Sequence, residues 1–374
     1  MASALISLGA SLYKGLIKPL LFLKDPEKVH LRALSLGQYF GSSQFAKNIF
    51  SAVLKYEHPA LEQNLFGITF ENPIGLAAGF DYEARLTQIL PSLGFGFGTV
   101  GTLTNLPYEG NPRPMLGRLP KSRSLMVNKG FKNLGVRATL LNLKQLQFGY
   151  PVGVSIGKTN TDVHKTQREA ILDISEGFKS AEESGVPFFY YELNISCPNL
   201  KGSIEFYEPA HLNELFQALR GLTTSRPIFV KMPISKTDSE IREMMDVIVL
   251  YPHIKAVILG NLERNRANPA LDQEEVRKFP QGNFSGLPCQ KRSDELISLV
   301  HKEYGSKIRI IGCGGIFSAE DAYRKIKLGA SLVQLITGLV FEGPQLVSEI
   351  NRAFPDFLKR DGYSSISEAI GTYS

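Results

Sequence analysis

The chain has 374 residues and a formal net charge of +6, and 43% of its residues are hydrophobic. This length can bury a large core, either as one large domain, such as a barrel of about 250 residues, or as two ordinary ones. The basic residues are scattered, so the charge favours anionic surfaces such as phosphate or lipid and argues against nucleic-acid binding. The three cysteines, Cys197, Cys289 and Cys313, match neither a disulfide framework nor a metal site, which favours a reducing compartment.

The first 24 residues predict an amphipathic helix. Leucines recur at every third or fourth position, and polar residues recur between them. The apolar face comprises Leu5, Leu8, Leu12, Leu16, Leu20 and Leu23, and the polar face comprises Ser3, Ser7, Ser11, Lys14 and Lys18. A membrane-spanning helix would lack this polar stripe, so we expect the helix to lie along a surface. A charged leader and a small-residue cleavage site are missing, so we expect no secretory signal.

A second helix is predicted to begin at Asp25, which can cap it, with Pro26 at its first position. Its apolar stripe would comprise Val29, Ala33, Leu36 and Phe40. Two interpretations of this extension, residues 1–45, remain open. The helices either pack on the main domain or contact a membrane or a lipophilic molecule.

From about residue 65, short apolar runs alternate with helix-length segments. After a hairpin or plug at "GITFENP", eight such runs follow, at 73–79, 97–102, 152–157, 190–196, 227–232, 254–260, 308–315 and 331–337. Helices are predicted between them, for example over 164–184, 209–220, 237–250 and 318–328. Strands this apolar are buried on both faces, so residues 60–374 predict a (β/α)8 TIM barrel rather than an open doubly wound sheet.

Polar residues follow these strands at the end where barrel active sites are built. They are Gly79–Asp81, Thr102, Ser155–Lys158, Asn194, Lys231, Asn261, Gly314–Gly315 and Thr337–Gly338. A purely structural barrel would not need amides and lysines at so many strand ends. The set therefore predicts an active site at this end of the barrel.

Glycines after the last two strands, in "IIGCGGIFSAEDA" and "LVQLITGLVFEGP", predict a phosphate site made of backbone N–H groups. Ser318 or Asp321 can begin the helix that follows the first of them. The alternative is a pair of tight turns that bind no ligand. A G-x-G-x-x-G pattern after the first strand is missing, so a Rossmann-type dinucleotide is not indicated.

Lys231 follows an apolar run in "FVKMP" and is expected to face the barrel mouth, where a cation can hold negative charge on a bound ring. The alternative is a lysine that reaches solvent. Asn194, Asn199 and Asn261 flank the same mouth, and their amides suit a ring with carbonyl and N–H groups. Each of these asparagines alone can also be a turn residue.

The order of eight motifs resembles that of dihydroorotate dehydrogenases. They are "NPIGLAAGFD", "GNPRP", "GFKNLGV", "NISCPN", "VKMP", "FSGLP", "IIGCGGI" and "GASLVQLITG". Together with "DPEKVH", the similarity covers about residues 25–353 and is greatest to the membrane-associated, quinone-linked class. It implies an enzyme with flavin mononucleotide (FMN) that oxidises dihydroorotate to orotate in pyrimidine synthesis. It also implies peripheral association with the cytoplasmic face of the cell membrane, or with the mitochondrial inner membrane in a eukaryote.

The resemblance implies roles for particular residues. The cofactor would contact Ala78, Gly79, Thr102, Ser155, Asn194, Lys231, Gly286, Gly314, Gly315, Ile336, Thr337 and Gly338. The substrate would contact Tyr82, Asn128, Lys129, Gly130, Phe131, Asn194, Asn199 and Asn261. Cys197 stands at the position of the catalytic base.

Four positions depart from the family pattern. Tyr82 replaces a lysine, Val127 and Ser155 replace asparagines, and Cys197 replaces the serine of the quinone-linked class, as in the soluble class. Three alternatives therefore stay open. They are a soluble-type enzyme that uses fumarate or NAD, a flavoprotein that lacks catalysis or acts on a related substrate, and a flavin-free phosphate-binding barrel.

Cys197 lies between two asparagines, and neither a disulfide partner nor metal ligands stand near it in the sequence. A free thiol titrates near ~8.5, far below a hydroxyl, so the sequence predicts a better base at neutral pH than serine. The loop "LKGSIEFYEP" would exclude water from it. The alternative is a buried, inert thiol.

Overall fold

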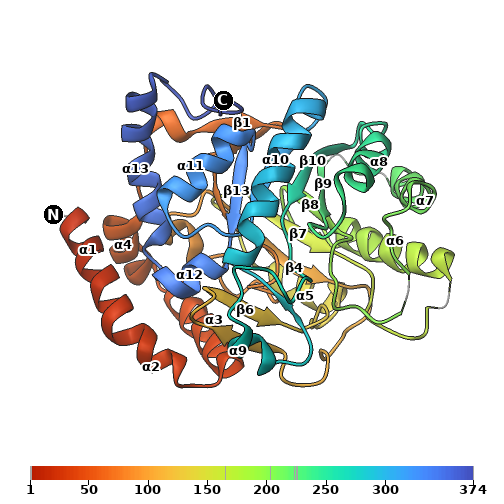
Figure 1. The fold of residues 1–374 in the computed structure, drawn as a ribbon, viewed down its shortest axis with the longest axis horizontal. Helices are drawn as coiled ribbons and strands as arrows, with labels where there is room; N and C mark the ends of the chain where they lie inside the picture. Colours follow the sequence, from red (N-terminus) through yellow and green to blue (C-terminus); the bar gives the residue numbers. More distant parts are fainter. Residues whose placement is uncertain (1, 165, 203, 223, 225, 374) are drawn as a thin grey trace.

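The computed structural model describes residues 2–164, 166–202, 204–222, 224 and 226–373, and its centre is a closed barrel of eight parallel strands (Figure 1). Around the barrel these are β3 (Ile74–Leu76), β4 (Phe97–Leu103), β7 (Val152–Ile156), β8 (Tyr190–Asn194), β9 (Ile228–Met232), β10 (Ile254–Leu259), β12 (Arg309–Cys313) and β13 (Leu332–Leu335). Each coincides with one of the eight predicted apolar runs. Pairing of Val333 with Ile74 joins β13 to β3 and closes the ring. The predicted (β/α)8 barrel is confirmed.

Helices surround the barrel on its outer face (Figure 1). They are α5 (Val136–Leu143), α6 (Gln167–Glu183), α7 (Pro209–Arg220), α8 (Asp238–Ile248), α10 (Gln290–Tyr304), α11 (Ala319–Leu328), α12 (Thr337–Glu342) and α13 (Leu346–Asp361), whereas α9 (Gln273–Arg277) packs against Leu119, Met126 and Phe284 at the carboxyl end of the strands. Single 3-10 turns occur at Pro59–Leu61, Leu90–Leu93 and Leu287–Cys289. Local sequence fixes several starts: capping boxes begin α6 and α8, and the Ser318 side chain accepts from the Asp321 N–H at the start of α11.

Different structures cover the two ends of the barrel (Figure 1). At the amino end of the strands, the hairpin of β1 (Gln63–Leu65) and β2 (Ile68–Phe70) packs Phe70 against Phe97 and Phe66 against Phe229. This confirms the predicted plug. At the carboxyl end lies a three-stranded antiparallel sheet of β5 (Leu116–Leu119), β6 (Ser124–Val127) and β11 (Asn283–Phe284). The candidate site therefore lies at the carboxyl end of the barrel, opposite the plug and beside this small sheet.

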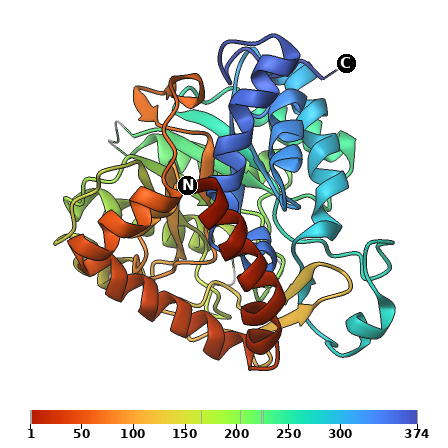
Figure 2. The same ribbon diagram turned by 90° about the vertical axis from the view of Figure 1, so that its left-hand side faces the viewer.

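An N-terminal extension of helices lies on the outside of the barrel (Figure 2). It consists of α1 (Ala2–Leu12), a π-helical turn η1 (Tyr13–Ile17), α2 (Lys18–Phe22), α3 (Pro26–Ser42) and α4 (Gln44–Leu54). The Asp25 carboxylate accepts from the Lys28 N–H and Pro26 begins α3, as predicted. The predicted stripe of α3 is partly wrong, because Ala33 and Leu36 are exposed and Leu34 is the buried residue instead.

The leucines of the first helix face away from the protein. All six predicted leucines, from Leu5 to Leu23, are between 49% and 85% exposed, whereas Ile6 and Ala10 are buried against the rest of the molecule. The apolar stripe is therefore not packing surface for the barrel. By length and composition, the 19 residues Ala4–Phe22 could also cross a membrane, and 11% of them are buried. The side chain of Ser3, predicted on the polar face, lies outside the described residues.

Candidate active site

A chain of hydrogen bonds crosses three neighbouring strands at the carboxyl end of the barrel. The Asn194 amide donates to Thr102 Oγ1 at 2.8 Å, and Thr102 Oγ1 lies 2.9 Å from Ser155 Oγ. Ser155 Oγ donates to Glu192 Oε1 at 3.2 Å. All four side chains are buried. The structure thus brings together three predicted residues from β4, β7 and β8, and it adds Glu192.

Lys231 extends from β9 into the same cluster. Its ammonium lies 3.7 Å from Glu192 Oε1, and both side chains are buried. The interpretation in which this lysine reaches solvent is therefore wrong. Sequence reasoning missed Glu192, although a charged residue within the apolar run "YYELN" was a signal that could have identified it.

Ser196 connects Asn261 to this cluster. Asn194 Oδ1 accepts from the backbone N–H and the hydroxyl of Ser196, at 3.2 and 3.0 Å. The Asn261 amide in turn donates to Ser196 Oγ. Because Asn261 follows β10, the bridge spans the two strands on either side of β9 and Lys231.

A second group of amides surrounds Asn199. Its Nδ2 donates to the Val127 carbonyl at 3.1 Å, and its Oδ1 accepts from the Asn283 amide at 2.6 Å. Asn111 donates to the Asn199 carbonyl at 2.9 Å and to Asn128 Oδ1 at 3.0 Å. The predicted Asn128 and Asn199 are therefore linked through Asn111. That residue was not predicted, although the motif "GNPRP" contains it.

Gly130 and Phe131 make a sharp turn beside this group, each with φ of 63°. Asn160, which sequence reasoning missed, donates to the Gly130 carbonyl at 3.1 Å and accepts from the Lys201 N–H at 2.6 Å. The Phe131 ring lies so close to Gly157 that a Cβ atom there would come within 2.7 Å of it. The turn therefore brings Phe131 to the end of strand β7, next to Ser155 and its partners.

Lys129 supplies a cation beside Tyr82. Its ammonium lies 4.8 Å from the centre of the Tyr82 ring and 3.2 Å from Nδ1 of His30 on α3. Burial and the neighbouring Lys129 lower the pKa of His30 to about 3, so the ring is neutral, and its Nε2 donates to the Phe80 carbonyl at 2.8 Å. Burial also lowers the pKa of Lys129 to about 8. The family pattern has a lysine at position 82, where this chain has Tyr82. Lys129, from another segment, places a cation next to that position instead.

The predicted phosphate loops meet at the starts of α11 and α12. Gly314 and Gly315 have φ of 102° and 70°, a conformation that favours glycine. Thr337 begins α12, and its hydroxyl lies 2.8 Å from Ser285 Oγ. Gly286 follows Ser285, and a Cβ atom on it would lie 2.7 Å from the Thr337 methyl group. Loops distant in sequence therefore converge on one point.

The loop after β3 completes this side of the mouth. Gly79, with φ of 110°, donates its N–H to the Gly101 carbonyl at 2.7 Å, and Ala78 before it is buried. Among the described residues, the one atom within 4 Å of a Cβ on Gly79 is the Ile336 methyl, at 3.7 Å. Gly338 is packed instead, because its Cβ would collide with the Ile316 carbonyl. Gly79 therefore has open space next to it, as the approach of a flat ligand requires.

Cys197 follows β8 and is half-buried. It borders a small cavity of about 40 Å³, whose lining includes Lys158, Asn194, Pro198, Phe206 and Tyr207. Burial raises the pKa of the thiol to about 12, more than the Asn199 N–H, Lys231 and Lys158 together lower it. The expectation of a thiol that titrates near its free value is therefore corrected. Ser203, in the predicted water-excluding loop, lies outside the described residues.

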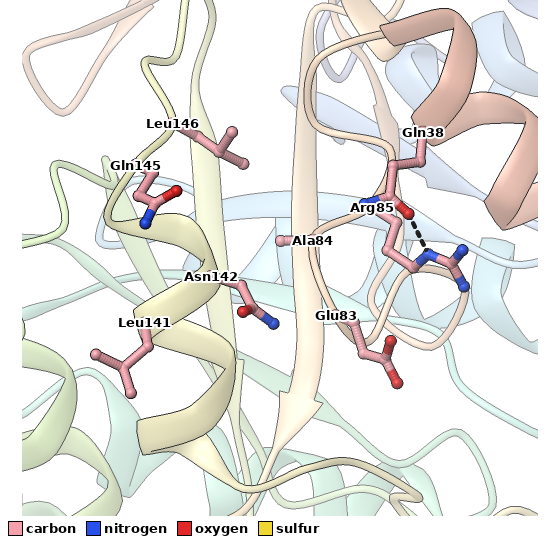
Figure 3. A pocket seen from close by; sticks show the side chains of 8 residues that line it. All are labelled: Gln38, Glu83, Ala84, Arg85, Leu141, Asn142, Gln145 and Leu146. Carbon is pink, nitrogen blue, oxygen red and sulfur yellow. Dashed lines mark hydrogen bonds between the residues drawn. The ribbon is translucent and has the colours of Figure 1, made fainter. Parts of the chain in front are cut away.

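Another pocket, of about 470 Å³, lies between α3, residues 83–85 and α5 (Figure 3). It is lined by Gln38, Glu83, Ala84, Arg85, Leu141, Asn142, Gln145 and Leu146. The Arg85 guanidinium donates to Gln38 at 2.8 Å and to Ser35 at 2.9 Å, which ties α3 to the barrel. The pocket contains none of the predicted site residues.

Fold and site together define a barrel enzyme whose active site is built at the carboxyl ends of its strands. The family model for dihydroorotate dehydrogenase matches residues 60–358. The chain belongs to the dihydroorotate dehydrogenase family and is an oxidoreductase that acts on a CH–CH group.

Relatives in other organisms extend this similarity to nearly the whole chain. The dihydroorotate dehydrogenase (quinone) of Nostoc sp. is 36% identical and that of Sulfurimonas denitrificans 35%, over 96% and 95% of this chain and 98% and 97% of theirs. The solved structure of Eimeria tenella DHODH with ferulenol is 28% identical, with a TM-score of 0.81 over 93% of this chain and 95% of that one. The prediction of a quinone-linked dihydroorotate dehydrogenase is therefore confirmed.

Proposed function

We propose that the protein uses FMN to oxidise dihydroorotate to orotate and passes the electrons to a membrane quinone, as a step of pyrimidine synthesis. The observation that carries this proposal is the buried Lys231 beside three hydrogen-bonding side chains at the mouth of the barrel. A buried cation at the carboxyl end of a barrel strand is better suited to an electron-rich ring than to an apolar core.

The residues present fit FMN. The phosphate would lie at the converging loops, against Gly315, Thr337 and the start of α12, because the first N–H groups of a helix have no partner within it. The ring would lie over Gly79, where the backbone leaves open space, and against Lys231 and Asn194. Remaining contacts at these loops and at the neighbouring strand ends would come from Ala78, Thr102, Ser155, Gly286, Gly314, Ile336 and Gly338. When bound, FMN supplies the hydride acceptor of the reaction.

The chain itself would bind and orient the substrate and move one proton. Asn194, Asn199 and Asn261 would hold the ring amides of dihydroorotate, and Asn128 would act through Asn111. Gly130 and Phe131 would close the pocket beside Gly157. Cys197 Sγ would take the proton from the carbon next to the ring carbonyl while hydride leaves the neighbouring carbon.

The direct test is to purify the protein, measure its flavin absorbance and then measure dihydroorotate turnover with a short-chain quinone. We expect bound FMN and quinone-dependent formation of orotate. Fumarate and NAD serve as comparison acceptors, because Cys197 is typical of the soluble class. A colourless protein would contradict the cofactor, and faster turnover with fumarate or NAD would contradict the quinone.

Lys129 gives the substrate site a pH dependence that can be measured. If this lysine holds the carboxylate of orotate, affinity depends on its charged form, which predominates below its pKa of about 8. Orotate affinity, measured from the flavin spectrum, is therefore expected to fall as pH rises through about 8. Lys129→Met should bind orotate roughly ten- to a hundredfold more weakly at neutral pH, without that pH dependence.

The matched control for this prediction is Lys144→Met, because Lys144 is exposed, whereas the nearer Lys132 itself helps to lower the pKa of Lys129. It should leave both the affinity and its pH profile as in the unmodified protein. Unchanged orotate affinity in Lys129→Met would remove this lysine from the substrate site.

The extension is proposed to attach the enzyme to a membrane and to admit the quinone. Six exposed leucines along one helix present an apolar surface that the barrel does not cover. Behind that helix, Phe22 of α2 packs against Phe341 at 5.4 Å, in an apolar cluster that includes Val127 and Phe317. Because the Val127 carbonyl accepts from Asn199, this cluster connects the extension with the mouth. The proposed location is the cytoplasmic face of the cell membrane, or the mitochondrial inner membrane in a eukaryote.

Serine substitution of Leu8, Leu12 and Leu16 together tests this attachment. Each leucine that enters lipid gains about 1.5–3 kcal/mol, so binding to vesicles of phosphatidylcholine and phosphatidylglycerol should weaken at least about a hundredfold. Flavin reduction by dihydroorotate should be unaffected, because the three leucines are exposed. Serine substitution of Leu141, Leu172 and Leu250, which are equally exposed but lie on the barrel, is the matched control. Equal losses in both variants would show that the helix has no special role.

A further inference from the structure

We propose that Glu192 is a positioning residue that holds Lys231 and offsets its charge beneath the bound flavin, and so lowers the reduction potential of the flavin. The inference rests on the proposed function, because it needs a flavin at the mouth of the barrel. It assigns a role to a carboxylate that the motifs of the family resemblance do not mark as functional.

The position of Glu192 in β8 places it at the floor of the site. Alternate residues of a barrel strand face the interior, so Tyr190, Glu192 and Asn194 lie one above another. Below, the Tyr190 hydroxyl lies 2.9 Å from Thr99 Oγ1 in a filled layer of the barrel. Above, Asn194 donates to Thr102 at the mouth. Glu192 therefore lies between the filled layer of the barrel and Asn194 at the mouth.

The contacts of Glu192 suit a carboxylate that offsets the positive charge of Lys231. Its Oε1 accepts from Ser155 at 3.2 Å and lies 3.7 Å from the Lys231 ammonium. Within the described part of the chain, it is the one carboxylate within ion-pair distance of Lys231. Its Oε2 is buried and has no hydrogen-bond partner among the described residues. An ionised carboxylate at this depth is costly unless a cation lies close to it, and Lys231 is that cation.

This contact also explains the serine at position 155. The resemblance implies an asparagine there that approaches the flavin, but the short Ser155 side chain instead bonds to Thr102 and Glu192. The serine therefore orients the carboxylate, which lies within ion-pair distance of the lysine. Loss of Glu192 would leave the full positive charge of Lys231 facing the ligand.

Glu192→Gln tests the role, because glutamine keeps the shape and removes the charge. With FMN bound, we expect a flavin midpoint potential at least about 30 mV more positive, which is a tenfold change for a two-electron couple. Sulfite should also bind the flavin at least tenfold more tightly, because adduct formation places negative charge on the ring. Glu182→Gln is the control, since Glu182 pairs with Arg226 away from the mouth. In this variant, neither the midpoint potential nor the sulfite affinity should change.

The same substitution in a Lys231→Met protein shows whether Glu192 acts through Lys231 or in some other way. In Lys231→Met, the carboxylate of Glu192 no longer has a cation to position or to offset. Glu192→Gln should then shift the potential by less than half as much as in the unmodified protein. Equal shifts in both backgrounds would overturn the proposed pairing. If Glu192→Gln fails to fold, Glu192→Asp can be used, because its side chain is one methylene shorter and moves the carboxylate away from Lys231. It should give a smaller shift of the midpoint potential, with the same sign.

An unchanged potential and an unchanged sulfite affinity in the folded, FMN-bound variant would overturn the inference. This result differs from failure of the proposed function, in which the unmodified protein would lack flavin or fail to oxidise dihydroorotate.

Discussion

Lys231→Ala is expected to weaken FMN retention and to slow reduction of the remaining flavin by roughly ten- to over a hundredfold. The loss of one buried charge-assisted hydrogen bond costs about 1.5–3 kcal/mol, which sets this range. The effect should be large because Lys231 is buried, and its one ion-pair partner in the described part of the chain, Glu192, is buried beside it. The measurements are the flavin content after gel filtration and the rate of flavin reduction in a stopped-flow experiment.

The control for this prediction is Lys255→Ala. Lys255 is an exposed residue of the neighbouring strand β10, so its removal should change neither quantity. Wild-type flavin content and reduction rate in Lys231→Ala would refute the assignment of this lysine to the cofactor.

Cys197→Ala is expected to retain FMN and to lose roughly 10²–10⁴ of the rate of flavin reduction, the usual contribution of a general base. Cys197→Ser should keep a slow activity that increases toward higher pH, because a hydroxyl loses its proton less readily than a thiol. Thiol alkylation should inactivate the enzyme, and bound orotate should protect it. Cys289 and Cys313 are buried, so Cys197 should be the cysteine that reacts.

The raised pKa of Cys197 determines the pH profile of the unmodified enzyme. The thiol is protonated below about 12, and a base must be deprotonated, so the active fraction grows about tenfold per pH unit below that value. Flavin reduction should therefore accelerate from about pH 6 to about pH 9 without reaching a plateau. A plateau in this range, or full activity of Cys197→Ala, would show that another group takes the proton.

The barrel could be predicted because its strands are buried on both faces and therefore read as continuous apolar runs, such as "YYELN" and "IRIIGC". The candidate site could be predicted only in part. Asn194 and Lys231 were accessible to sequence reasoning because they end such runs. Asn160 and Asn283 were not, since each acts through a tertiary contact, with Gly130 and Asn199 respectively.

Two other features depended on the three-dimensional arrangement. Periodicity identified an apolar stripe from Leu5 to Leu23, but it could not decide whether that stripe faces the barrel or solvent. The free-thiol pKa of Cys197 was a poor guide for a similar reason. Burial, which no local pattern reports, outweighs the nearby cations Lys158 and Lys231.

The short helix α12 links the two ends of the proposed electron path. Thr337, at its start, belongs to the phosphate loops, whereas the Val340 carbonyl accepts from the Tyr13 hydroxyl at 2.8 Å. Glu342, at its end, pairs with Lys14 and Arg123, each at 2.6 Å. A displacement of the N-terminal helix at a lipid surface would therefore be transmitted to the proposed phosphate site through α12, which is fewer than two turns long. The helix α12 thus couples the membrane-facing helix mechanically to the flavin site. A protein that has lost its flavin should therefore position its N-terminal helices less rigidly.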